Sequence, residues 1–335
     1  MKYEDAGVNI GRKAGALRAA SAKIRGTYTP EVLWGLGAFG GMLDASRLKG
    51  LEHPVLVAST DGVGTKTLLA AQTGRWEGLG FDIVNHCVND LLVQGAKPLF
   101  FLDYVASARL EPDLLGKVLE SLAEACKAAG MPLLGGETAE MPGVYHPGGL
   151  DLVGTIVGVV DRQRIVDGSR VEPGDAILAL PSSGLHTNGY SLARKVLADW
   201  DLEEPRPELA GASLATALLK PHQSYLEPVS RLLESGLEVR AMAHITGGGV
   251  YENLPRVLPE GLGAEIQIGS WPVPPVFSLI QRAGGVEGAE MFRVFNMGLG
   301  YLIVMKESDM EPARQTLGVG YRVGRIVAGA GVRVL

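Results

Sequence analysis

The sequence predicts a two-domain subunit of α/β to α+β architecture. Its 335 residues exceed what a single hydrophobic core usually supports. From residue 55 onward, short apolar runs alternate with segments of helical periodicity. This alternation stops over the polar stretch DRQRIVDGSRVEPGD, in which Pro173-Gly174 predicts a turn. We therefore expect an N-terminal domain over residues 1–165 and a C-terminal domain over residues 166–335.

The N-terminal half alternates between strand and helix patterns. Strands are expected at residues 55–59, 98–106, 131–136 and 151–160, and helices at residues 64–74, 81–96 and 112–130. Gly130 suits the left-handed position that commonly ends a helix. Residues 12–25 are rich in basic side chains, and we expect them to form a mobile, solvated arm rather than a transit peptide.

The C-terminal half shows a second cycle of strands and helices. Strands are expected at residues 176–183, 239–246, 264–268, 298–305 and 321–327, and helices at residues 188–200, 222–236 and 248–259.

Composition excludes several classes of protein. The formal net charge is −6 and no long basic block occurs, which argues against a nucleic-acid partner. Cys87 and Cys126 are too few for a disulfide framework, and no His/Cys spacing fits zinc. The most apolar run, at residues 152–160, is too short to span a membrane, and the N-terminus lacks a signal-peptide core. We therefore expect a cytoplasmic protein with no membrane partner.

The stretch STDGVGTKT at residues 59–67 resembles a phosphate loop but breaks the Walker rule, because Thr65 precedes Lys66 where that rule requires glycine. It follows a strand and opens a helix, so Asp61 is expected beside free backbone N–H groups. In one interpretation Asp61 binds a magnesium ion and Lys66 neutralises phosphate charge, while Gly62 and Gly64 let the phosphate approach the backbone closely. The other makes Asp61 a helix N-cap and leaves Lys66 solvated. This segment alone does not decide between them.

Further acids favour the first interpretation. Asn89 and Asp90 lie inside an apolar helical pattern, where an unpartnered carboxylate would cost several kcal/mol. Glu137 and Glu140 lie in GGETAEMPG, which is expected to follow a strand. Asp61, Asp90 and Glu137 are the oxygen ligands that Mg²⁺ prefers. GLGAFG at residues 35–40 matches a dinucleotide fingerprint only weakly, since no clear strand precedes it.

Two loops of the second half predict anion binding. SSGLHTNGYS at residues 182–191 and HITGGGVYEN at residues 244–253 each precede a predicted helix. His186 or His244 could transfer protons, although a lone histidine is more often structural. His86 lies one turn before Asp90 and is placed to orient it. The remaining histidines are interpreted as loop or cap residues: His53, His146 and His222.

These segments together resemble the phosphoribosylformylglycinamidine cyclo-ligase family of purine synthesis. The resemblance runs nearly end to end, and GGETAEMPGVY, SSGLHTNGYSL and HITGGGVYENLPRVLP carry it most specifically. It implies ATP and Mg²⁺, and a homodimer in which strands of two subunits form a shared barrel. It also implies that the glycine-rich arm, with Gly37, Gly40 and Gly41, covers the nucleotide.

The resemblance and the residues together give a full set of candidate roles. Asp61, Asp90 and Glu137 are assigned to metal, and Asp61, Lys66, His186 and Asn188 to catalysis. Nucleotide and phosphate contacts are assigned to the lid glycines and to Gly62, Gly64, Thr65, Asn89, Gly136, Thr138, Gly247, Gly248 and Gly249. The small-molecule substrate implied by the family is formylglycinamidine ribonucleotide.

The chain departs from the family pattern at four positions, Asn9, Leu150, Thr187 and Tyr301. Thr187 keeps the hydroxyl of the usual serine, whereas Asn9 loses a charge. The alternatives that remain are a sister ATP-dependent small-molecule kinase and a nucleotide-binding regulator without turnover. Retention of the acids, Lys66 and the glycine loops argues against the regulator.

Overall fold

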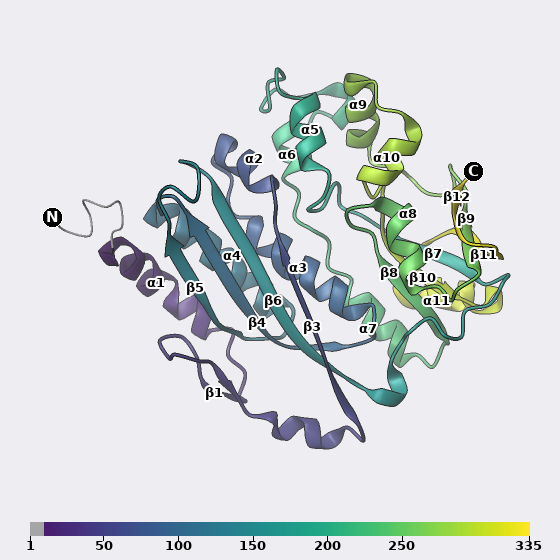
Figure 1. Ribbon diagram of the computed structural model, residues 1–335, viewed down its shortest axis with the longest axis horizontal. Coiled ribbons are helices and arrows are strands. Elements are labelled where there is room, and N and C mark those ends of the chain that lie inside the picture. The colour runs from purple at the N-terminus through teal and green to yellow at the C-terminus, as the bar shows by residue number, and fades with distance from the viewer. Residues whose placement is uncertain (1–9) are drawn as a thin grey trace. The chain divides into compact units, whose positions relative to one another are not determined.

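The computed structural model describes residues 10–335, with side chains from residue 15 (Figure 1). The described chain divides into two compact units. Unit 1 holds the residues up to Leu91 together with Ala96–Gln163, and unit 2 holds Leu92–Gly95 together with Arg164–Leu335. Each unit combines a β-sheet with helices, which confirms the predicted mixed α/β class.

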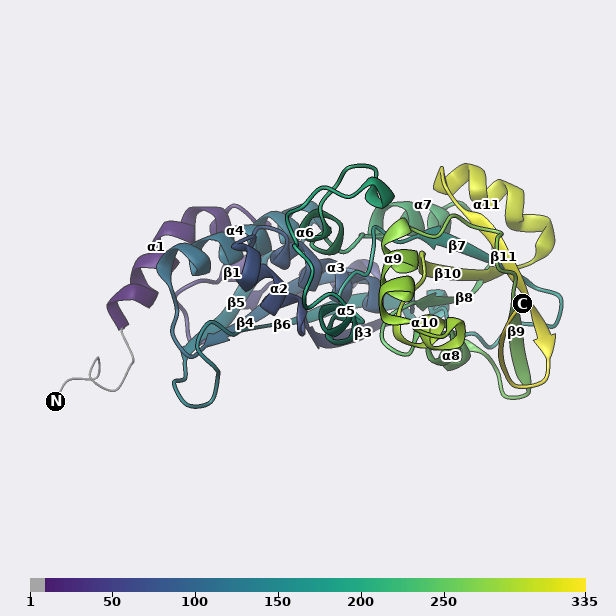
Figure 2. The same ribbon diagram turned by 90° about the horizontal axis from the view of Figure 1, so that it is seen from above.

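Unit 1 is built on a four-stranded sheet in the order β3, β6, β4, β5. The strands are β3 (Pro54–Gly62), β4 (Lys97–Ser107), β5 (Leu133–Glu140) and β6 (Leu150–Asp161). β4 and β5 run parallel, while β6 is antiparallel to both of its neighbours. Helices α3 (Leu79–Leu92) and α4 (Pro112–Ala128) lie on one face of this sheet (Figures 1 and 2). Shorter elements complete the unit: β1 (Val32–Trp34), β2 (Met42–Leu43), a 3-10 helix (Ala45–Gly50) and α2 (Lys66–Thr73).

The alternation along β6 explains why only one face is covered. Leu152 and Ile156 are buried, whereas Val153, Thr155 and Val157 between and beside them are only half-buried. This period of two is the pattern of a strand with one face against the core. Gly154 sits on the covered side, where an added Cβ would lie 2.2 Å from the Phe101 ring. The second face therefore carries apolar side chains that no layer of the described residues covers.

The N-terminal basic segment corrects an expectation. Instead of a mobile arm, residues 10–25 form helix α1 (Ile10–Arg25), which packs against α4. Among the side chains described from residue 15 onward, Ala16, Ala20 and Ile24 are buried at helical spacing. The sequence signal was weak because two of these three contacts are alanines among many charges.

Unit 2 is built on a six-stranded sheet in the order β12, β9, β11, β7, β10, β8. The strands are β7 (Ala176–Pro181), β8 (Val239–His244), β9 (Leu262–Ile266), β10 (Leu299–Met305), β11 (Tyr321–Ala328) and β12 (Gly331–Val334). Every residue of β8 and β10 is buried, which accounts for their continuous apolar sequences. Helices are α5 (Tyr190–Val196), α6 (Leu214–Leu218), α7 (Leu226–Glu234), α8 (Gly249–Asn253), α9 (Pro275–Gly284), α10 (Gly288–Val294) and α11 (Met310–Leu317).

Several bounds differ from the sequence-based expectation. β5 continues through the glycines to Glu140, so Glu137 lies within a strand and not after one. Helices α6, α9, α10 and α11 and strand β12 were not expected. Across residues 10–335, no helix combines the length and the apolar character that crossing a membrane requires.

Candidate active site

Two carboxylates of unit 1 converge on one buried histidine. Asp61 lies near the end of β3, and Asp90 and His86 lie one turn apart on α3. His86 Nε2 is 2.9 Å from Asp61 Oδ2 and 3.5 Å from Asp90 Oδ2. Ser59 Oγ also donates to Asp90 Oδ2 at 3.3 Å. The structure thus brings Asp61 and Asp90 together and places His86 where it orients both.

The ionisation of His86 and Asp61 is governed by the contact between them. Burial lowers the pKa of His86, but hydrogen bonds to Asp61 and Asp90 outweigh burial and raise it to about 9. Burial also opposes ionisation of Asp61, yet the same contact with His86 holds the pKa of Asp61 below its ordinary value. Because Asp61 Oδ2 and Asp90 Oδ2 approach the same point, they fit two oxygen ligands of one Mg²⁺.

The pairing of strands in the unit 1 sheet places Glu137, the third predicted metal ligand, away from Asp61. Asp61 pairs with Gly154, Gly154 with Asp103, and Asp103 with Gly136, which precedes Glu137. This row crosses the whole sheet from β3 to β5. Three strand spacings amount to roughly 14 Å. Within one subunit, Glu137 therefore cannot share an ion with Asp61 and Asp90.

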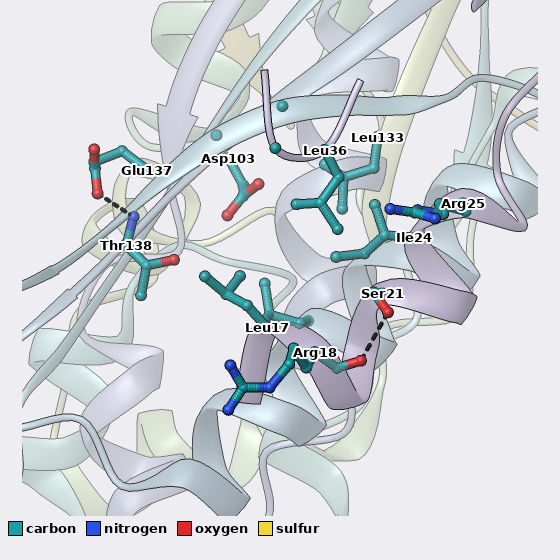
Figure 3. A pocket seen from close by; sticks show the side chains of 14 residues that line it. Leu17, Arg18, Ser21, Ile24, Arg25, Leu36, Asp103, Leu133, Glu137 and Thr138 are labelled. Atoms are coloured by element: carbon teal, nitrogen blue, oxygen red, sulfur yellow. Dashed lines mark hydrogen bonds between the residues drawn. The ribbon is translucent and has the colours of Figure 1, made fainter. Parts of the chain in front are cut away.

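Glu137 instead lines a cavity of about 520 Å³ beside β5 (Figure 3). Apolar side chains of α1, α4, β5 and the loop after β1 form most of its wall, while Asp103 and Thr138 supply polar groups. Glu137 Oε1 accepts the backbone N–H of Thr138 at 2.7 Å (Figure 3). The residues that line the cavity are Leu17, Arg18, Ser21, Ile24, Arg25, Leu36, Gly37, Asp103, Leu119, Leu133, Gly135, Gly136, Glu137 and Thr138.

Asp103 is the acid in this cavity that sequence reasoning missed. Burial, with a smaller contribution from nearby Glu137, raises the pKa of its carboxyl to about 7. Gly136 faces it so closely that an added Cβ would lie 2.1 Å from Asp103 Oδ1. The signal was present, because Asp103 interrupts an apolar strand as Asp90 interrupts an apolar helix.

The STDGVGTKT loop differs from the N-cap interpretation of Asp61 and from both interpretations of Lys66. Asp61 belongs to β3 and accepts from Gly62 N–H, while Thr65 occupies the N-cap position of α2. Lys66 is fully buried, and its Nζ contacts Asp82 Oδ1 at 2.7 Å. A buried ion pair of this kind holds the start of α2 to α3. In this arrangement Lys66 has no access to a phosphate, which corrects the role assigned to it.

The remaining nucleotide candidates of unit 1 differ in their surroundings. Gly37 lines the cavity, and Gly40 and Gly41 are exposed. Gly41 also lies close to Leu134, because an added Cβ would be 2.4 Å from Leu134 Cγ. Asn89, which was assigned to a nucleotide contact, is fully buried in helix α3.

The two predicted anion loops of unit 2 do lie together. A Cβ added to Gly247 would lie 3.3 Å from Asn188 Oδ1. Asn253 Nδ2 donates to the carbonyls of Gly247 and Gly249, at 3.0 and 2.8 Å, and so fixes the glycine loop. Gly248 and Gly249 have φ of 90° and 58°, a region that favours glycine.

The neighbouring histidines form a buried group. His186, with φ 62°, lies in the loop before α5, and His244 ends β8. His222 lies in the loop before α7, as expected, but it is buried against both of them. Sequence spacing gives no sign of this grouping, because three separate segments supply the three rings.

Comparison with known proteins agrees with this two-unit organisation. Residues 44–160 match the model for "AIR synthase related protein, N-terminal domain", and residues 172–335 match that for the C-terminal domain. Phosphoribosylformylglycinamidine cyclo-ligases of Bacillus cereus (strain ZK / E33L) and Bacillus anthracis are each 48% identical over 337 residues. Each alignment covers 98% of this chain and 96% of the relative.

More distant solved structures share the fold. Thiamine-monophosphate kinase from Stenotrophomonas maltophilia K279a is 18% identical with a TM-score of 0.68, covering 94% of this chain and 95% of that one. The hydrogenase maturation protein HypE, solved "in complex with ATP", is 18% identical with a TM-score of 0.68, covering 93% and 86%. With both family domains matched in order and 48% identity along nearly the whole chain, this protein belongs to the phosphoribosylformylglycinamidine cyclo-ligases of the AIR synthase family.

Proposed function

We propose that this chain closes the imidazole ring of aminoimidazole ribonucleotide from formylglycinamidine ribonucleotide, with ATP converted to ADP and phosphate. The observation that carries this proposal is 48% identity over 98% of the chain to enzymes of that name. A sister kinase is less favoured, since the thiamine-monophosphate kinase structure is only 18% identical.

The chemistry explains why ATP is consumed. Ring closure requires the formyl oxygen to leave, and an oxide is a poor leaving group. Phosphorylation of that oxygen creates a good one. The amidine nitrogen then attacks the activated carbon, the C–N bond forms, and phosphate departs with the electron pair of the C–O bond. The protein's task is to position these groups, stabilise charge and exclude water.

In this proposal, unit 1 binds ATP. The apolar cavity beside β5 suits a nucleotide base, and its lining includes Arg18, Arg25, Gly136 and Thr138. Asp61 and Asp90 would hold Mg²⁺, which supplies charge neutralisation at the phosphates. Support comes from the convergence of both carboxylates on His86 Nε2.

We assign substrate binding to unit 2. Its paired loops bring the peptide groups of Gly247, Gly248 and Gly249 next to Asn188, a surface suited to a ribose phosphate. Asn188 is half-buried, and His186, two residues before it, is buried. These two residues are proposed to lie nearest the reacting atoms.

A homodimer would resolve the separation of Glu137 from Asp61. β3 and β5 are the two edges of the four-stranded sheet, and residues 10–335 provide no covering layer for its second face. Pairing two such sheets edge to edge gives the shared barrel implied by the family. Glu137 of the partner subunit would then complete the magnesium site formed by Asp61 and Asp90. We place this dimer in the cytoplasm, where Cys87 and Cys126 remain free thiols.

The test is an assay of ADP and aminoimidazole ribonucleotide with ATP, Mg²⁺ and formylglycinamidine ribonucleotide. Equal molar yields of the two products, both dependent on substrate, are expected. ADP formed only with another phosphate acceptor would establish the kinase alternative. ATP binding without turnover under any of these conditions would establish a regulator.

A further inference from the structure

Three imidazole rings meet inside unit 2, and their arrangement exceeds what substrate contact by His186 requires. His186, His222 and His244 are at most 5% exposed, and one ring nitrogen of each lies within 4.8 Å of the others. The His186 and His222 rings stack with centroids 3.9 Å apart and an interplanar angle of 22°. Such a group can bind a transition metal or conduct a proton.

Hydrogen bonding favours the second role. His186 Nε2 accepts the backbone N–H of Ser183 at 3.1 Å, so in the neutral ring the proton sits on Nδ1. A ring in this state offers no further in-plane lone pair to a metal. Stacking also directs the lone pairs of His186 and His222 along parallel planes, and not toward one shared point. Three-imidazole zinc coordination would require both features to be undone.

The remaining contacts define a directed hydrogen-bonded chain. Asn188 Nδ2 donates to Thr187 Oγ1 at 3.4 Å, and the Thr187 hydroxyl can in turn donate to His222 Nδ1, also at 3.4 Å. A neutral His222 that accepts at Nδ1 carries its proton on Nε2. His222 Nε2 lies 2.9 Å from His244 Nε2, so that proton points at the second ring.

We propose that Thr187, His222 and His244 form a proton relay that takes up the amidine proton released on ring closure. The proposal rests on the proposed function. As the amidine nitrogen bonds to the formyl carbon, its N–H proton passes to Thr187 Oγ1. The Thr187 proton passes to His222 Nδ1, and the proton on His222 Nε2 passes to His244 Nε2. One imidazolium results, and phosphate leaves with its electron pair.

The surroundings of the relay suit this task. His186 stacks on His222, Tyr225 lies beside His186, and Tyr301 lies beside His244, with ring centroids 6.3 Å apart in each tyrosine pair. Tyr225 donates its hydroxyl to the Pro181 carbonyl at 2.8 Å, and burial raises the pKa of Tyr225 well above its ordinary value. Both 3.4 Å contacts involve Thr187, and catalytic hydrogen bonds commonly shorten when substrate binds.

Position 187 allows a matched test. Thr187→Val keeps the shape and removes the hydroxyl, whereas Thr187→Ser keeps the hydroxyl and removes a methyl group. We expect Thr187→Ser to retain kcat within about threefold, and Thr187→Val to lose about 100-fold or more in kcat with KM little changed. Similar kcat values for the two variants, with thermal stability intact, would overturn the relay.

His222 provides an independent readout that a packing role would not give. His222→Ala should lose about as much kcat as Thr187→Val. It should regain much of that activity when imidazole is added, because the small base fills the space that the side chain left. His53→Ala, at an exposed histidine, serves as the control and should be unaffected. No rescue in a folded His222→Ala protein would contradict the proposal. If the unaltered protein forms no aminoimidazole product, the proposed function itself fails, which is a separate result.

Discussion

Two carboxylates stabilise the protonated form of His86, and the titration of this ring can be followed directly. In magnesium-free buffer we expect its NMR titration midpoint near pH 9, because Asp61 and Asp90 stabilise the imidazolium. Asp61→Asn should lower this midpoint, and Mg²⁺ should lower it in the unaltered protein by drawing both carboxylates away. A midpoint near 6.5 that Mg²⁺ does not move would contradict the proposed metal position.

The same shift fixes the sign of a stability effect. The folded-state pKa of His86 is raised, so its contribution is fully present below about pH 6.5 and is lost as pH rises through about 9. The stability difference between the unaltered protein and Asp61→Asn should therefore shrink between pH 7 and pH 10. Thermal melts across that range measure it.

Asp103 should show a stability effect in a different pH window. Its folded-state pKa is raised to about 7, so ionisation destabilises the fold as pH rises from about 4 to about 7. Asp103→Asn cannot ionise and should be more stable than the unaltered protein above pH 7, by about 1–2 kcal/mol after allowance for partial exposure. At pH 4 the two should melt alike. Equal stability at pH 8 would show that Asp103 is not in a desolvated site.

At the scale of elements, the packing of helix α1 gives a specific prediction. Ala20 is fully buried on the helix that packs against α4, while its neighbour Ala19 is exposed. Ala20→Asp should detach the helix, cost about 2–4 kcal/mol and open Arg18 and Arg25 to trypsin. Ala19→Asp is the matched control and should remain resistant. Rapid cleavage at Arg18 in the unaltered protein would contradict the docked helix.

Local sequence patterns predicted the elements that turn residues clearly delimit. β3, the glycine loop and α2 follow one another as expected, because Gly62, Gly64 and the apolar periodicity fix them locally. α1 was missed, since alanines at Ala16 and Ala20 give a weak apolar stripe. β12 was missed as well, because it is a short strand at the edge of its sheet.

Site residues were predictable where local chemistry is sufficient. Asp90 was found because a carboxylate inside an apolar helix needs a partner, and His86 fulfils that need. Lys66 could not be placed from sequence, since its partner Asp82 lies 16 residues away on the next helix. The contact between His222 and His244 depends on the tertiary fold and is invisible in their spacing.

At the scale of the whole molecule, the uncovered face of the unit 1 sheet predicts self-association. Leu56 on edge strand β3 is 62% exposed, beside other apolar side chains of that face. Light scattering should give about twice the 35.4 kDa chain mass. Leu56→Asp should shift the protein toward monomer with its helical content intact. A monomer at micromolar concentration would contradict the shared barrel.

The most direct test of the account follows the formyl oxygen. We would supply formylglycinamidine ribonucleotide labelled with ¹⁸O at that atom, together with ATP and Mg²⁺, and analyse the released phosphate by mass spectrometry. The account predicts one ¹⁸O atom in each phosphate released, with one aminoimidazole ribonucleotide formed per ADP. Unlabelled phosphate, or ADP without the aminoimidazole product, would contradict it.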